Sequence, residues 1–163
     1  MHLEGSCHCG AVRFSLESRH PVPYQRCYCS ICRKTQGGGG YAVNLAGEAA
    51  SLQVEGRAHT RIYHAVLREP DGNTTSNAER VFCGLCGSAL WLYDDRWPEL
   101  IHPFASAVDT ALPVPPEHTH LMLDGAPAWV EPQIKPRDKC FCRYPEESIA
   151  EWHQRLGLEQ AAG

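Results

Sequence analysis

Nine cysteines, gathered into four short clusters, constrain this chain more than any other feature of its 163 residues. The clusters read CHCG from Cys7, CYCSIC from Cys27, CGLCG from Cys83 and CFC from Cys140. The N-terminal stretch MHLEGSCHCG has no charged start followed by an apolar run, and no segment is long enough to span a membrane, so we expect a cytoplasmic protein with no membrane partner. In a reducing compartment, clustered thiols are more typical of metal ligands than of disulfides.

Two of the clusters end in glycine and suit a closed metal site. The CGLCG cluster, from Cys83 to Gly87, places two thiolates three residues apart. A tight turn can point both sulfurs into one site while its backbone N–H groups donate to them, and the trailing glycine permits the left-handed conformation that closes the turn. Cys7 and Cys9 are the best second pair. We therefore expect a structural four-thiolate zinc site on Cys7, Cys9, Cys83 and Cys86; the alternative is a set of buried free thiols.

The CYCSIC cluster places three thiolates, Cys27, Cys29 and Cys32, in one loop. Three protein ligands and one open position are the usual pattern of a catalytic zinc. Four glycines follow at residues 37–40, and Gly37 and Gly38 would let a substrate lie close to the metal because they carry no side chain. Because a single loop supplies every ligand, we expect this second zinc to be held weakly and its site to be partly occupied in purified protein.

Alternatives remain open for this loop and for the last cluster. A distant side chain could close the three-cysteine site, and the candidates are Cys140, Cys142, His59, His64, His102, His118 and His120. An iron–sulfur cluster would also need a fourth cysteine. The CFC cluster lacks a following glycine, so we interpret it as having no metal role. A redox-exposed pair and an accessory ligand pair are the other interpretations of that cluster.

The hydrophobic pattern predicts a mostly β chain. Apolar residues alternate with polar ones at Val12, Phe14 and Leu16, and short runs rich in Val, Ile and Tyr are separated by turns that contain glycine or proline. Residues 69–79 are almost entirely polar and predict a loop. Many short strands with turns between them suit a sheet-rich fold that bound metal holds together.

Only the tail of the chain is predicted to be helical. Ile149, Trp152 and Leu156 recur at the spacing of one helix face. Glu146 and Glu147 are expected in the first turn, where negative charge stabilises a helix.

Length and charge indicate the class of protein and of partner. A chain of 163 residues has the usual size of one domain, so we expect a single domain over residues 1–163. Lysine and arginine total 15 against 19 acidic residues, and no basic block stands out. The formal net charge of −4 therefore predicts no nucleic-acid partner.

Three motifs, in order along the chain, resemble one enzyme family. GSCHCGAVRF near the start, then CYCSICRK, then VFCGLCGSALW match the motifs of the glutathione-dependent formaldehyde-activating enzyme family, which also includes the centromere protein V-like proteins. The resemblance covers residues 5 to about 130, since HLMLDGAPAWVE is similar to the closing segment of the family. RYPEESIAEWHQRLGL resembles a C-terminal extension of some members, with a helix expected within about 137–158.

The resemblance implies a fold, two metal ions and an activity. The fold is a zinc-stapled β-tent of short antiparallel strands. The activity is that of a carbon–sulfur lyase, which reversibly joins formaldehyde and glutathione. The implied ligands are the two sets already named, with structural zinc on Cys7, Cys9, Cys83 and Cys86 and catalytic zinc on Cys27, Cys29 and Cys32.

The ligand type indicates how such a reaction would proceed. Three thiolates leave zinc a weak Lewis acid that is better suited to holding a further thiolate than to generating hydroxide. The thiol of glutathione would therefore ionise as the fourth ligand and attack the carbonyl carbon of the aldehyde. Arg33 and Lys34 could receive the carboxylates of glutathione, although they could equally be a solvated surface pair. His120 could pass a proton, or it could be a half-buried strand histidine.

Membership of a broad family does not fix the substrate, so the aldehyde and the thiol remain expectations. The main alternative is a zinc-stabilised binding module whose second site is closed or vestigial. A closed site with four protein ligands would favour that module, and an open position would favour the enzyme. A thiol redox or metal-handling protein that uses Cys140 and Cys142 is a further alternative.

Overall fold

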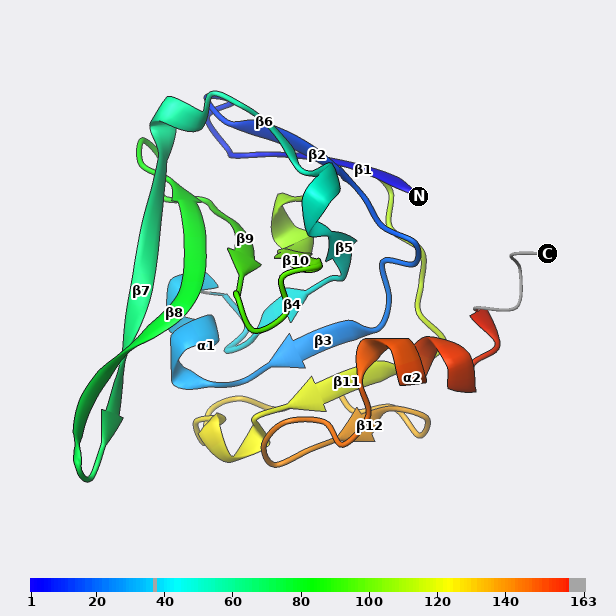
Figure 1. The fold of residues 1–163 in the computed structure, drawn as a ribbon. Helices are drawn as coiled ribbons and strands as arrows, with labels where there is room; N and C mark the ends of the chain where they lie inside the picture. The colour runs from blue at the N-terminus through cyan, green and yellow to red at the C-terminus, as the bar shows by residue number, and fades with distance from the viewer. Residues whose placement is uncertain (37, 159–163) are drawn as a thin grey trace. The chain divides into compact units, whose positions relative to one another are not determined.

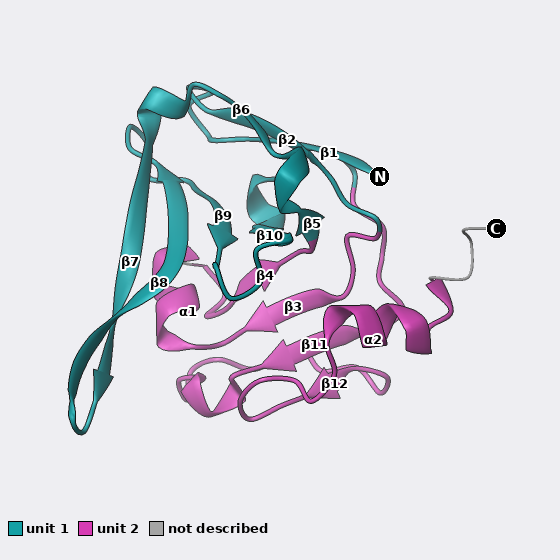
Figure 2. Cartoon of the chain, viewed as in Figure 1, with its two compact units in different colours: residues 1–19, 47–111 teal, residues 20–46, 112–163 magenta. Residues whose placement is uncertain are grey.

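The computed structural model describes residues 1–36 and 38–158. The chain divides into two compact units, which Figure 2 draws in different colours. Unit 1 comprises residues 1–19 and 47–111, and unit 2 comprises residues 20–46 and the chain from residue 112 onward. Strands dominate both units, and a C-terminal helix is present, which confirms the predicted mostly β class. That the whole chain folds as one domain stays a prediction.

The first sheet of unit 1 is antiparallel and has three strands. In spatial order these are β1 (His2–Ser6), β2 (Arg13–Glu17) and β6 (Gln53–Glu55). Val12, Phe14 and Leu16 are buried, which confirms the alternation that the sequence shows. The ring of Phe14 packs edge-on against Trp91 of the second sheet, with 5.3 Å between ring centroids. The apolar face of this sheet therefore forms part of the core of unit 1.

The second sheet of unit 1 is antiparallel and has five strands. In spatial order these are β5 (Gly47–Glu48), β10 (Leu100–Pro103), β9 (Ala89–Tyr93), β8 (Gly72–Cys83) and β7 (Thr60–Glu69). The prediction of a loop over residues 69–79 is wrong, because β7 and β8 pair as one long hairpin (Figure 1). Thr74 and Thr75 lie opposite Leu67 and Val66, and their β-branched side chains favour strands even though they are polar.

Unit 2 contains a four-stranded sheet. In spatial order its strands are β12 (Lys139–Cys140), β11 (His118–Leu121), β3 (Tyr24–Cys27) and β4 (Ala42–Asn44). Antiparallel pairing predominates among the described strands, and the exceptions among them lie in this sheet, where β11 runs parallel to both β3 and β12. The register places His120 beside Arg26 and Leu121 beside Cys27. Because successive side chains alternate between the two faces of a strand, His120 and Cys27 project from opposite faces of this sheet.

The helices of the described residues are short. The α-helices are α1 (Ser30–Gln36) and α2 (Ile149–Arg155), and the 3-10 helices are η1 (Ala49–Ser51), η2 (Arg57–His59), η3 (Ala105–Ala107) and η4 (Leu123–Gly125). The expectation that only the tail is helical is wrong, because α1 follows β3 directly. At this length α1 presents too few turns for a hydrophobic period to be visible in the sequence. In the described part of the chain, none of the helices has the length and apolar character that crossing a bilayer requires.

The C-terminal helix begins later than the sequence pattern suggests. Ser148 is its N-cap, with its side chain accepting from the Glu151 N–H while the Glu151 carboxylate accepts from the Ser148 N–H. Glu146 and Glu147 therefore precede the helix, and the acidic residue of the first turn is Glu151. This capping box outweighs the charge pattern because it satisfies two backbone donors that the helix leaves unpaired. The buried Trp152 anchors the helix by donating to the Glu117 carboxylate at 2.8 Å.

The capping box yields a stability prediction. Replacing Ser148 with alanine removes the side-chain acceptor for the Glu151 N–H, so we expect the free energy of unfolding to fall by about 1 kcal/mol. Urea denaturation followed by circular dichroism measures the change. Glu146→Ala is the matched control and should leave the midpoint unchanged, because Glu146 lies outside the helix and is exposed. A larger effect from Glu146→Ala than from Ser148→Ala would contradict this assignment of the helix start.

Candidate metal centres

The first candidate centre lies in unit 1, where two glycine-closed turns meet. In the turn after β1, the Gly10 N–H donates to the Cys7 carbonyl at 2.9 Å, and in the turn after β8, the Gly87 N–H donates to the Cys83 carbonyl at 2.8 Å. Gly10 and Gly87 have φ values of 74° and 77°, in the left-handed region that favours glycine. Both turns therefore have the geometry that the spacing predicts.

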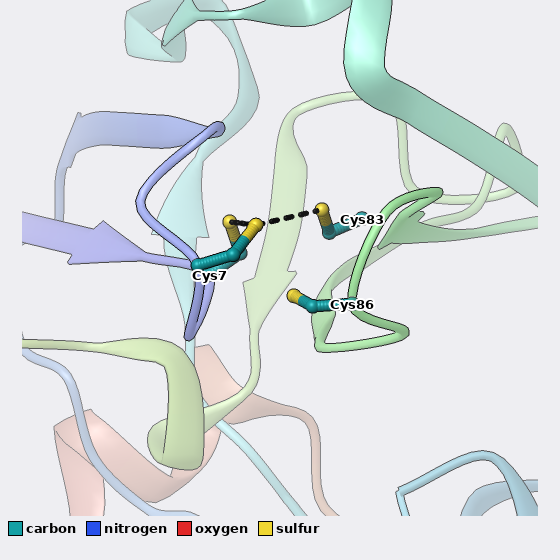
Figure 3. Close-up of side chains that lie close together, drawn as sticks. Cys7, Cys83 and Cys86 are labelled. Atoms are coloured by element: carbon teal, nitrogen blue, oxygen red, sulfur yellow. Dashed lines mark hydrogen bonds between the residues drawn. The ribbon is translucent and has the colours of Figure 1, made fainter.

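The sulfurs of these turns converge as a metal site requires. The Sγ atoms of Cys7 and Cys9 lie 3.5 Å apart, and those of Cys9 and Cys83 lie 3.8 Å apart. With Cys86, all four ligand atoms lie within 4.8 Å of one another, and Figure 3 shows Cys7 facing the turn that carries Cys83 and Cys86. Four sulfurs at about 2.3 Å from one tetrahedral zinc would be about 3.8 Å apart. The four-sulfur group thus matches the size of a zinc–thiolate site.

The protonation of these thiols also favours a bound cation. Hydrogen bonds from the side chain and backbone of Ser88 lower the pKa of the Cys86 thiol to about 5. The Ala11 N–H lowers the pKa of Cys9, but its contacts with the neighbouring thiols outweigh this effect and raise it to about 11. The thiolate of Cys86 therefore forms readily, whereas the thiol of Cys9 resists ionisation unless positive charge is present. A divalent metal ion supplies that charge.

The second candidate centre lies in unit 2, where β3 leads into α1. β3 ends at Cys27, α1 carries Cys32, and Cys29 lies between them; the three Sγ atoms lie within 4.8 Å of one another. The Cys32 N–H donates to Cys29 Sγ at 3.3 Å. Hydrogen bonding among the three thiols raises the pKa of Cys27 and lowers that of Cys29. This group, too, can ionise fully only beside a cation.

The candidates for a fourth ligand in unit 2 stay outside this three-sulfur group. Cys140 and Cys142 are exposed, and neither they nor His118 or His120 belong to it. Among residues 1–36 and 38–158, the group has no further Cys, His, Asp or Glu ligand atom. The described chain therefore offers a three-thiolate set, whereas the first centre is a four-thiolate set. That Cys140 and Cys142 have no metal role stays a prediction.

The residues predicted to contact substrate lie close to these ligands in the chain. Arg33 and Lys34 lie in the last turn of α1, and Lys34 is exposed. The Nε of Arg33 is buried without a hydrogen-bond partner in the structure as described. Gly38 is exposed, whereas Gly37 lies outside the described residues. The roles of all four in binding stay predictions.

His120 is fully buried, where the sequence left open a half-buried position. Its Nδ1 lies 2.9 Å from the Tyr28 hydroxyl, and its Nε2 lies 3.1 Å from Asp138 Oδ2. Sequence reasoning missed both partners. One signal was available in the sequence: His118 and His120 lie two residues apart on a strand and therefore share a face. In the structure Asp138 contacts both, and its Oδ1 lies 3.2 Å from His118 Nδ1. A shared acceptor for two such histidines was therefore a reasonable expectation.

Comparisons with known proteins are consistent with one family. The family model described as glutathione-dependent formaldehyde-activating enzyme matches residues 2–124. A Halomonas elongata protein whose name carries the same enzyme description is 64% identical over 160 residues, which cover 98% of this chain and 99% of that protein. A crystal structure of a Rhodobacter sphaeroides protein superposes with a TM-score of 0.52 at 24% identity, covering 68% of this chain and 91% of that one. The structural match supports the fold. The region that the family model matches, residues 2–124, includes both cysteine groups.

Proposed function

Because the chain belongs to the glutathione-dependent formaldehyde-activating enzyme family, we propose that it catalyses the reversible joining of formaldehyde and glutathione, a carbon–sulfur lyase reaction. The observation that carries the proposal is the convergence of Cys27, Cys29 and Cys32 as a three-thiolate set in the matched region. Such a set holds a metal ion while leaving one coordination position for a substrate atom. The product of the joining reaction is S-hydroxymethylglutathione.

We propose zinc as the metal of both centres. Sulfur ligands at tetrahedral spacing suit zinc, and a thiolate set without imidazole or carboxylate disfavours magnesium and calcium. The four-cysteine centre would be structural because its protein ligands complete the coordination. The three-cysteine centre would be catalytic, with the thiol of glutathione as its fourth ligand. When bound there, zinc would ionise that thiol at neutral pH.

The reaction then balances without any further reagent. The sulfur of glutathione forms a bond to the carbonyl carbon of formaldehyde, and the electron pair of the C=O bond moves to oxygen. That oxygen takes up a proton equivalent to the one the thiol released. In reverse, the carbon–sulfur bond breaks and the same proton returns to sulfur. The chain has to hold the sulfur, admit the small aldehyde and orient the rest of glutathione.

Orientation of glutathione is the role we propose for the basic end of α1. Arg33 directly follows the ligand Cys32, and its buried Nε has no partner within the described structure. A carboxylate of glutathione would supply the missing acceptor, and Lys34 could meet the second carboxylate. Gly38 is exposed, and a Cβ added there would meet no atom within 4 Å, so the glycine segment leaves room for a substrate on this side.

Metal removal provides the test of this function. We expect the zinc-loaded protein to accelerate the exchange between free glutathione and S-hydroxymethylglutathione, measured by NMR exchange spectroscopy in mixtures with formaldehyde. Treatment with a mild chelator that removes the second zinc should return the exchange to its uncatalysed rate, and added zinc should restore it. Unchanged circular dichroism provides the folding control. The proposed reaction would be contradicted if the exchange rate stayed at its uncatalysed value in the presence of the zinc-loaded protein.

A further inference from the structure

A buried chain of hydrogen bonds lies behind the three-cysteine centre in unit 2. It joins the Tyr28 hydroxyl to His120 Nδ1 at 2.9 Å, and His120 Nε2 to Asp138 Oδ2 at 3.1 Å. The residues Tyr28 and His120 are fully buried, and the Asp138 side chain is 1% exposed. Polar groups removed from water in this way hold a fixed geometry, because breaking one bond leaves its partner unsatisfied.

The direction of each bond follows from Asp138. Burial raises the pKa of its carboxyl, but hydrogen bonds from the Lys135 and His118 N–H groups, at 2.9 and 2.8 Å, help to lower it well below its usual range. An ionised Asp138 can only accept, so His120 donates through Nε2–H. The other ring nitrogen of a neutral imidazole then accepts from the Tyr28 hydroxyl. The Asp138 carboxylate thus fixes the tautomer of His120, and His120 in turn fixes the direction of the hydrogen bond from the Tyr28 hydroxyl.

Tyr28 connects this chain to the metal ligands. It lies between Cys27 and Cys29, and its N–H donates to the Leu121 carbonyl at 3.0 Å. A Cβ added to Gly125 would lie 3.2 Å from both Cys29 Cα and the Tyr28 carbonyl, so the backbone of η4 packs directly against the ligand turn. The turn is therefore held by its backbone and, through Tyr28, by one side chain.

We propose that Tyr28, His120 and Asp138 act as one positioning chain, which holds the turn from Cys27 to Cys29 in the geometry that lets three thiolates share one metal ion. This inference rests on the proposed function, since it assumes that the three-cysteine centre binds zinc. His120 then acts from behind the ligands, which agrees with its place on the face opposite Cys27. Asp138, which supplies the carboxylate of the positioning chain, lies beyond residues 2–124, the region that the family model matches. The C-terminal segment of this protein therefore supports its metal centre.

Zinc release tests the positioning chain. Tyr28→Phe removes the donor to His120 and should speed zinc transfer from the three-cysteine centre to a competing chromogenic chelator by about 10–100-fold, the usual effect of losing a group that orients a metal ligand. Tyr24→Phe is the matched control, because it also removes only a hydroxyl. The hydroxyl of Tyr24 donates to the Pro113 carbonyl and not to His120. It should leave the release rate unchanged. Zinc held by the four-cysteine centre reports folding in each sample.

A double-mutant cycle distinguishes one connected chain from separate contacts. If the residues act through one another, Tyr28→Phe combined with Asp138→Asn should release zinc no faster than the more affected single variant. Cobalt in place of zinc should show the same altered thiolate-to-metal absorption in both single variants. Wild-type release kinetics from Tyr28→Phe, or additive effects in the double variant, would overturn the inference. If Asp138→Asn fails to fold, the comparison of Tyr28→Phe with Tyr24→Phe decides alone.

The same experiment separates this inference from the proposed function. If the wild-type protein releases zinc in two phases and Tyr28→Phe changes the rate of neither, the positioning chain is overturned and the catalytic zinc stays in place. Wild-type protein with no second zinc to release would overturn the proposed catalytic centre itself, and the positioning chain with it.

Discussion

Replacing Cys83 with serine is expected to remove one zinc ion from each chain and to prevent stable folding. Cys83 is fully buried, ends β8 and lies 3.8 Å from the sulfur of Cys9. A structural zinc can contribute on the order of 10 kcal/mol to folding, which is comparable with the whole stability of about 5–15 kcal/mol of a typical domain. Serine offers a poor ligand and leaves three thiols that repel one another when ionised.

The measurement is zinc content and circular dichroism of Cys83→Ser purified without chelator. Cys142→Ser is the matched control: its thiol is exposed and lies outside both cysteine groups, so it should retain two zinc ions and the native spectrum. A Cys83→Ser protein that unfolds cooperatively at the wild-type temperature would show that this centre contributes little to stability. That result would contradict its structural role.

Replacing Cys29 with serine is expected to abolish activity while leaving the fold intact. Cys29 is partly exposed, accepts from the Cys32 N–H and supplies one of three sulfurs. Two thiolates hold zinc far more weakly than three, so we expect kcat/KM for S-hydroxymethylglutathione formation to fall by more than about 100-fold. This exceeds the loss typical of replacing a residue that only orients a metal ligand. One zinc ion should remain, bound by the four-cysteine centre of unit 1.

Initial rates and zinc content, measured on the same preparation, check this result. Cys140→Ser serves as the control, since Cys140 also lies in unit 2 but outside the three-sulfur group. It should keep both zinc ions and near-normal activity. Full activity in Cys29→Ser, or complete loss of activity in Cys140→Ser with both zinc ions retained, would contradict the assignment of the catalytic centre.

The cysteine groups could be predicted from the sequence because chelation is largely a local property. Two thiols separated by one or two residues and closed by glycine can reach the same metal only through a tight turn, and Gly10 and Gly87 adopt the backbone that such a turn needs. The pairing of the turns from Cys7 and Cys83 needed one further argument, that each supplies half of a tetrahedral set. The four sulfurs of these two turns converge as that argument predicts.

The remaining features depend on strand pairings that the pattern of apolar residues does not reveal. The strand over Gly72–Cys83 forms because β7 satisfies its backbone, and no alternation of apolar residues announces it. Asp138 reaches His120 because β12 lies parallel beside β11, a pairing that spacing alone does not reveal. Tyr28 reads as an ordinary residue between ligands until this partner is known. The metal-ligand groups could therefore be predicted from the sequence, whereas the hydrogen bonds that support them could not.

Cadmium NMR of the cadmium-loaded protein, recorded with and without glutathione, tests the central claim most directly. Cadmium replaces zinc at thiolate sites, and its chemical shift moves to lower field with each added sulfur ligand. We expect two resonances, of which only the one lost in Cys29→Ser moves to lower field when glutathione is added. S-methylglutathione, which has no free thiol, should move neither. If neither chemical shift changes when glutathione is added, the result would contradict a centre whose fourth ligand is the thiol of the substrate.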